Sequence, residues 1–188
     1  MIVAVVGSGG KTTLIKNLAQ KYRAEGKTVL VTTTTHMFLE EDTLLTDVAE
    51  VIIRHLEERG MVMAGVPEGN KIKALSPETL EAVCAIADVV LVEADGSKHM
   101  PLKFPNATEP VIPPKTEEII VVWGPQGLGK PAREVCHRLA LVMDCLGIDE
   151  DTPITREHVS ELLEKGYLKP LKQRYTNVKI RVYPTLTK

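Results

Sequence analysis

The sequence predicts an α/β fold in which a mainly parallel sheet lies between two layers of helices, a three-layer α/β/α arrangement. Short apolar runs alternate with helix-like segments, as expected where a crossover helix follows each strand of a parallel sheet. The apolar runs are continuous, which is typical of strands buried on both faces. With 188 residues, of which 44% are hydrophobic, the chain fits a single domain over residues 1–188.

The expected elements follow from these runs and from local start and stop signals. Strands are predicted at residues 2–6, 28–33, 88–93, 118–123 and 178–183, and helices at 11–25, 46–60, 76–87, 131–146 and 155–166. Ser76 before Pro77 is an N-cap signal, and Gly166 stands where the last of these helices is expected to end. Short apolar runs on both sides of residues 67–70 predict a small β-hairpin insertion. The proline-rich residues 101–114 are expected to form an irregular loop over the mouth of a site.

A glycine-rich turn between the first strand and the first helix carries the strongest functional signal. It consists of Gly7, Ser8, Gly9, Gly10, Lys11, Thr12 and Thr13. Glycines let successive backbone N–H groups point at phosphate oxygens, and the N-terminus of the following helix adds partial positive charge. We expect Lys11 to contact the β- and γ-phosphates and the Thr12 hydroxyl to ligate Mg²⁺. The turn predicts a P-loop NTPase-like, nucleotide-binding fold that takes ATP or GTP.

The spacing of this turn leaves the reaction open. The usual pattern is G-x-x-x-x-G-K-[ST], and here Val5 stands where the first glycine is expected. The same compact G-x-x-G-K-T-T spacing occurs in Mur-type peptide ligases, so the turn does not choose between hydrolase, kinase and ligase. The alternative without function is an ordinary strand-to-helix turn with a glycine cap.

A second glycine-rich segment, residues 124–131, matches the spacing better and the chemistry worse. Pro131 stands where the hydroxyl residue is needed, and proline offers neither a metal ligand nor an N–H group. Proline does suit the first position of a helix. We interpret this segment as a structural turn that opens the next helix and lines the same site.

Two carboxylates follow the third expected strand. Alternation along a strand places Glu93 and Asp95 on one face, and we expect both at the ligand edge of the sheet. There they would complete the Mg²⁺ shell with Thr12 or orient the attacking nucleophile, which makes Lys11, Glu93 and Asp95 the candidate catalytic residues. The structural alternative is a simple turn, because Asp-Gly is a common turn pair.

Other polar residues are expected near the same edge. Thr34 and His36 follow the second strand and are candidates for nucleotide or metal contacts, although threonine is also an ordinary strand residue. Lys98 is a candidate phosphate contact, and Lys103 is either a further one or a solvated surface lysine. His137-Arg138 lies within an expected helix and reads either as a cation for phosphate charge or as a solvated helix face.

Composition excludes some classes of function. The net charge of -2 and the 4% aromatic content give no signature of nucleic-acid binding. No apolar segment is long enough for a membrane span and the N-terminus shows no basic leader, so we expect no membrane partner and a cytoplasmic location. Cys84, Cys136 and Cys145 are interpreted as buried reduced thiols, the last two on opposite faces of one helix, and the alternative is a redox or selenium-carrying role for one of them.

Four motifs in this order resemble the YqeC family of selenium-dependent hydroxylase accessory proteins. They are G-S-G-G-K-T-T, T-T-T-T-H, V-E-A-D-G-S-K-x-x-P-L-K-x-P and G-x-G-K-P-x-x-E-V-x-H-R, and they cover most of the chain from Met1 to about Leu171. The stretch from Glu93 to Pro105 is the most specific. The resemblance implies a role in the maturation of selenium-dependent molybdenum hydroxylases, in making or inserting their labile selenium cofactor.

Together these observations predict a Mg²⁺-dependent nucleoside-triphosphate-binding protein, an NTPase or phosphotransferase. The resemblance implies that its partner is a selenium-dependent molybdenum hydroxylase or the cofactor of such an enzyme. Two alternatives stay open: an ATP-dependent Mur-like ligase, and a non-hydrolysing binding module or chaperone that uses nucleotide as a switch. No guanine-reading N-K-x-D motif follows the last strand, where residues 181–188 stand, so adenine is favoured over guanine. A truncated chain would hide such a segment.

Overall fold

A computed structural model describes residues 1–184. The helices are α1 (Lys11–Ala24), α2 (Ala49–Arg59), α3 (Pro77–Cys84), α4 (Ala132–Val135), α5 (Leu139–Leu146), α6 (Arg156–Leu163) and α7 (Lys169–Arg174), with a 3₁₀ turn at Pro125–Gly127 and a π turn at Glu164–Leu168. The strands are β1 (Ile2–Gly7), β2 (Val29–Thr33), β3 (His36–Phe38), β4 (Leu44–Leu45), β5 (Met61–Glu68), β6 (Lys71–Lys73), β7 (Val89–Glu93), β8 (Leu102–Lys103), β9 (Glu118–Val122), β10 (Cys136–His137) and β11 (Lys179–Tyr183).

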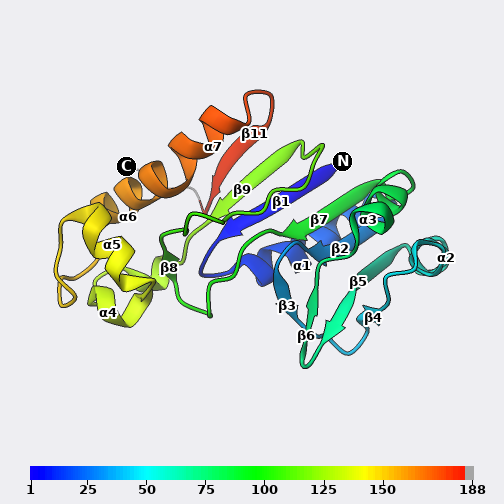
Figure 1. The fold of residues 1–188 in the computed structure, drawn as a ribbon, viewed down its shortest axis with the longest axis horizontal. Coiled ribbons are helices and arrows are strands. Elements are labelled where there is room, and N and C mark those ends of the chain that lie inside the picture. The colour runs from blue at the N-terminus through cyan, green and yellow to red at the C-terminus, as the bar shows by residue number, and fades with distance from the viewer. Residues whose placement is uncertain (185–188) are drawn as a thin grey trace.

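The five strands expected from the sequence all form, and they are parallel neighbours in the order β11-β9-β1-β7-β2 (Figure 1). Residues of β1, β2, β7 and β9 are all buried, which explains their continuous apolar runs. The chain leaves β1 toward β2 on one side, and after β7 it crosses to β9 on the other side. This change of direction beside β1 opens a crevice at the carboxyl ends of the strands, the usual ligand position in such sheets.

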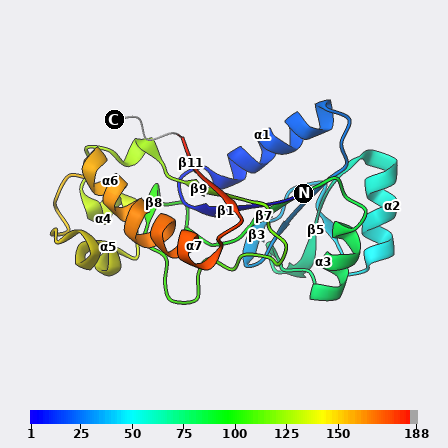
Figure 2. The same ribbon diagram turned by 90° about the horizontal axis from the view of Figure 1, so that it is seen from above.

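Helices cover both faces of the sheet, so the expected layers are present (Figure 2). Val3 and Val5 of β1 point to one face and pack with Leu14 and Ile15 of α1. The alternate residues of β1 point to the opposite face, where α2 and α3 cover one end and α6 and α7 the other. Because side chains alternate along a strand, successive residues of β1 belong to hydrophobic cores on opposite faces of the sheet.

The expected hairpin is β5–β6, an antiparallel pair that extends the sheet beyond β2. β3 pairs antiparallel with β6 and β4 pairs parallel with β5, so the sheet is mixed at this edge. Ser76 caps α3 as expected, since its hydroxyl accepts a hydrogen bond from the Thr79 amide. The hairpin brings β3 and β6 to the carboxyl edge of the parallel strands, beside the glycine-rich turn (Figure 1).

Two helix predictions are wrong. The segment expected as one helix over 131–146 is broken, because β10 interrupts it to pair in parallel with β8 in a separate two-stranded sheet. Cys136 therefore lies in a strand and Cys145 in α5, not on one helix. The helix expected to end at Gly166 continues through the π turn into α7.

Gly166 has a packing role instead of a capping role. A Cβ atom at this position would stand 3.0 Å from Cδ of Pro105 and 3.2 Å from the ring of Phe104. The glycine therefore lets the π turn approach the proline-rich segment, as close backbone approaches often require. In the described part of the chain, no helix is long and apolar enough to cross a membrane. Residues 181–188 were considered for base recognition, and the last four of them, 185–188, lie outside the described residues.

Candidate functional site

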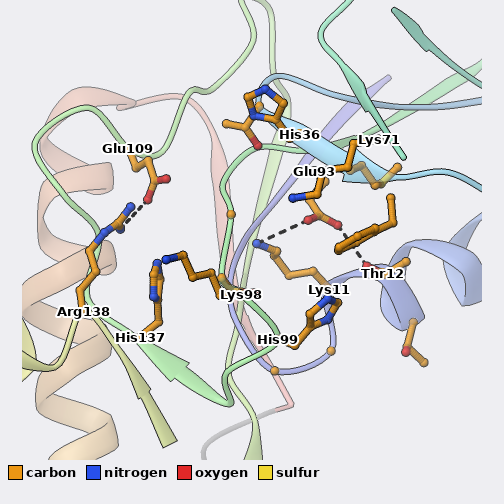
Figure 3. A pocket seen from close by; sticks show the side chains of 18 of the residues that line it. Lys11, Thr12, His36, Lys71, Glu93, Lys98, His99, Glu109, His137 and Arg138 are labelled. Carbon is orange, nitrogen blue, oxygen red and sulfur yellow. Dashed lines mark hydrogen bonds and ion pairs between the residues drawn. The ribbon is translucent and has the colours of Figure 1, made fainter. Parts of the chain in front are cut away.

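A cavity of about 720 Å³ lies at the carboxyl ends of the parallel strands (Figure 3). Three groups of residues line it: the turn before α1, the β3–β6 edge, and the segments after β7 and β9. The lining includes Gly9, Gly10, Lys11, Thr12, Thr13, His36, Glu93 and Lys98 of the residues expected from the sequence. Segments far apart along the chain thus meet at the crevice beside β1.

The glycine-rich turn is built for close approach. Gly9 (φ 78°) is wedged against the neighbouring loops, because a Cβ atom there would stand 2.5 Å from both the Gly124 Cα atom and the Pro101 carbonyl oxygen. Gly10 (φ 135°) is different, since a Cβ atom there would meet nothing within 4 Å. Gly10 also lines the cavity. Gly10 is exposed, so a ligand in the cavity can approach the backbone at this position.

Gly7 and Ser8, the first two residues of the turn, do not line the cavity. The Gly7 amide donates to Asp95 Oδ2 at 3.0 Å, and the Ser8 amide donates to the Val122 carbonyl at 2.9 Å. The Ser8 hydroxyl donates to the Pro101 carbonyl. The expectation that successive amides of the whole turn face one anion is therefore wrong for Gly7 and Ser8. These two residues anchor the turn, and the cavity side begins at Gly9.

Lys11, Thr12 and Glu93 form the polar floor of the cavity. The Lys11 ammonium lies 3.7 Å from Glu93 Oε1, and the Thr12 hydroxyl donates to Glu93 Oε2 at 3.2 Å (Figure 3). Burial raises the pKa of Glu93, while the Lys11 charge opposes this shift and the Asp95 charge adds to it. A hydroxyl beside a carboxylate is a donor set that suits Mg²⁺.

Asp95 contacts the glycine-rich turn but does not line the cavity. Its side chain is fully buried and bonded to Lys11 Nζ at 2.5 Å, Lys103 Nζ at 2.9 Å and the Tyr167 hydroxyl at 3.0 Å. Lys11 Nζ also donates to the Asp95 carbonyl. Burial beside this carboxylate raises the pKa of Tyr167 well above its ordinary value. The shared face expected for Glu93 and Asp95 at the cavity is wrong: Glu93 lines the cavity and Asp95 holds the turn from behind.

Thr34 also lies outside the cavity lining, and its hydroxyl donates to the Val111 carbonyl at 2.7 Å. His36 does line the cavity, where its ring lies 2.7 Å from Glu68. The second glycine-rich segment forms the 3₁₀ turn and leads into α4, as interpreted from the sequence, and Gln126 from this turn lines the cavity.

The far wall of the cavity contains residues that the sequence left open or did not indicate. Arg138, expected within a helix, stands between β10 and α5 and donates to Glu109 Oε2 at 2.7 Å. Lys103 is fully buried and also donates to Glu109 at 2.7 Å, so it is neither a phosphate contact nor a solvated lysine. Burial disfavours the Glu109 carboxylate, but hydrogen bonds from Arg138 and Lys103 outweigh it and lower the Glu109 pKa to about 2. Glu109 was missed because its partner Arg138 lies 29 residues away and because the burial of Lys103, six residues away, was not expected.

Comparison with known proteins gives one family. The model of the family described as YqeC protein matches residues 3–140. A relative from Escherichia coli (strain K12), "Uncharacterized protein YqeC", is 35% identical over 164 residues, which cover 81% of this chain and 63% of the relative. The chain thus spans less than two thirds of that relative's length. No solved structure matches. A family match over most of the chain, with a relative at this identity, establishes that the chain belongs to the YqeC family.

Proposed function

We propose that this protein binds a nucleoside triphosphate with Mg²⁺ and catalyses hydrolysis or phosphoryl transfer. The observation that carries the proposal is the accessible backbone at Gly10, next to the buried Lys11 ammonium and the Thr12–Glu93 pair. Backbone amides at the start of α1, together with its helix dipole, favour a phosphate group there.

The residues present fit such a ligand. Thr12 and Glu93 would hold Mg²⁺, which supplies charge neutralisation on phosphate oxygens when bound. Lys11 lies in the floor of the cavity, and Asp95 fixes its ammonium from behind. Catalysis would come from positioning and charge stabilisation, because phosphoryl transfer asks little covalent chemistry of a protein.

The biological role is proposed from the family. The resemblance to selenium-dependent hydroxylase accessory proteins supports a role in the maturation of selenium-dependent molybdenum hydroxylases. The nucleotide would then provide energy for making or inserting the cofactor. Adenine is the base that we include in the proposal, since no N-K-x-D motif occurs within residues 1–188.

The test is equilibrium binding of ATP and GTP, with and without Mg²⁺, to the wild type and to Thr12→Val. We expect Mg²⁺-dependent binding that weakens at least tenfold in Thr12→Val, because this variant loses a metal ligand and keeps its shape. Thr108→Val is the matched control, since the Thr108 hydroxyl also donates to a side-chain oxygen, that of Asn106, outside the cavity. Wild-type protein without Mg²⁺-dependent nucleotide binding, or equal loss in both variants, would refute the proposal.

A further inference from the structure

The cavity has a cationic wall that the proposed nucleotide site does not use. We give this name to Lys98 from the loop after β7, together with His137 of β10 and Arg138 beside it. Figure 3 shows these three side chains across the cavity from Lys11, Thr12 and Glu93, with the Lys98 side chain extending toward His137. The wall and the glycine-rich turn therefore line the same cavity, although they belong to different elements of the fold.

Buried contacts hold the wall in place. His137 is aligned with Lys103 in the β8–β10 pair, and Lys103 has no exposed side-chain surface. Arg138 donates to Glu109 at 2.7 Å and to the Phe104 carbonyl at 3.4 Å. The small second sheet thus fixes the two residues of the wall that come from the β10–α5 junction.

Two of the three wall residues, Lys98 and Arg138, have unfavourable backbone conformations. Four non-glycine residues in the described chain have left-handed φ angles, and three of them line the cavity: Lys98 (48°), His99 (62°) and Arg138 (61°). A left-handed conformation costs a residue with a side chain about 1–2 kcal/mol. Such conformations persist where surrounding structure imposes them, and they cluster at functional sites.

Lys98 carries a positive charge without a partner among the described residues, whereas the Arg138 charge is paired with Glu109. Within residues 1–184, the side chains of Lys98 and His137 make no hydrogen bond or ion pair, and the Glu109 carboxylate is already shared by Lys103 and Arg138. Partial burial lowers the pKa of His137, and the charges of Arg138, Lys103 and Lys98 lower it further. A bound anion would relieve this repulsion and accept hydrogen bonds from all three side chains.

We propose that the cationic wall binds an oxyanion group, phosphate or carboxylate, of a second substrate that lies beside the nucleotide. This inference rests on the proposed function and adds the substrate class: an anionic acceptor rather than water alone. The cavity of about 720 Å³ is within the range of sites for whole small molecules. Phosphate and carboxylate are both recognised by arginine and lysine, so the two sources share one recognition chemistry.

The experiment measures binding of inorganic phosphate and of succinate by calorimetry. The protein is first saturated with Mg²⁺ and a non-hydrolysable ATP analogue, so that the glycine-rich turn is occupied. The same titrations are run on nucleotide-free protein. The variants are Lys98→Gln, which changes only an exposed side chain, and the double variant Lys98→Gln/His137→Gln. Lys115→Gln is the matched control, because Lys115 also has a left-handed φ of 61° but lies outside the cavity.

We expect at least one probe to bind the nucleotide-loaded wild type, with affinity at least tenfold weaker in the double variant, intermediate in Lys98→Gln and unchanged in Lys115→Gln. Phosphate as the preferred probe identifies a phosphorylated second substrate, and succinate a carboxylic acid. Binding of both probes that is unaffected by the substitutions, or absent from wild type at roughly millimolar concentration, overturns the inference.

Failure of the two proposals can be told apart. If the double variant loses nucleotide affinity as far as Thr12→Val does, the wall belongs to the nucleotide site and the inference is wrong. If wild type binds no nucleotide while nucleotide-free protein still binds phosphate through Lys98 and His137, the proposed function fails and the anion site stands.

Discussion

Asp95 is the residue on which the geometry of the turn depends most. Its two carboxylate oxygens receive bonds from the Gly7 amide, Lys11, Lys103 and Tyr167, and none of its side chain is exposed. A buried carboxylate is tolerated only when its hydrogen-bonding capacity is met in this way. The four bonds join β1, α1, β8 and the π turn at one point. Asp95 therefore acts as a positioning residue for Lys11.

Replacing Lys103 tests this buried network. Lys103→Met keeps the apolar stem but leaves Asp95 and Glu109 each without one buried partner. We expect a loss of about 3–5 kcal/mol in the free energy of unfolding, measured by denaturant titration.

Lys115→Met is the control for this variant, because Lys115 forms an exposed ion pair with Glu81. Exposed pairs contribute little to stability, because solvent screens them. Equal destabilisation in the two variants would contradict the importance of the Asp95 network.

At the scale of single residues, sequence patterns identified Lys11, Thr12 and Glu93 as neighbours but not the surroundings of Asp95. The reason is physical. Strand alternation fixes which face a residue occupies only while the strand lasts, and β7 ends at Glu93. Whether a lysine such as Lys103 is buried depends on how the folded chain packs around it, and no local pattern contains that information.

Among the elements, the junction of β10 and α5 is held to the proline-rich segment by the Glu109–Arg138 bond. Glu109 has a folded-state pKa of about 2, below its ordinary 4.5, so it stabilises the fold fully above pH 4.5 and loses this contribution as pH falls toward 2. Because part of the carboxylate is solvent-accessible, screening reduces the effect to roughly 1 kcal/mol.

Thermal unfolding of Glu109→Gln at pH values between 6 and about 2 checks this pH dependence. We expect the variant to be less stable than wild type at pH 6 and to lose less stability on acidification, because it lacks the titrating group. Glu58→Gln, a change at an exposed position of α2, is the control and should follow wild type. A variant whose pH profile parallels that of wild type would rule out this role for Glu109.

The predicted elements were most accurate where local and tertiary preferences agree. Buried β-branched runs gave β1, β2, β7 and β9 to within a residue or two. The segment 131–146 failed because its helical periodicity is overridden by pairing of β10 with β8, more than thirty residues earlier. The prediction that a helix ends at Gly166 was wrong, because a glycine that ends a helix and one that allows close packing look the same in a sequence.

At the scale of the whole molecule, the sheet brings the site together. Convergence of the turn after β1 and of Glu93 at the end of β7 was predictable, since carboxyl ends of parallel strands share an edge. Neither the strand order nor the far wall was predictable, because both depend on how the segments after β7 and β9 cross the sheet. His137 and Arg138 line this wall, a position that their expected place within a helix did not indicate.

The central claim is that the backbone between Gly9 and Thr12 receives the phosphates of a nucleotide. Amide hydrogen exchange, resolved by residue with NMR, tests it on adding Mg²⁺ and a non-hydrolysable ATP analogue. We expect slower exchange at Gly10, Lys11 and Thr12, whereas Gly7 and Ser8, whose amides already donate within the protein, should change little. Nucleotide binding that leaves exchange at Gly10 to Thr12 unaltered and slows it elsewhere would contradict the account.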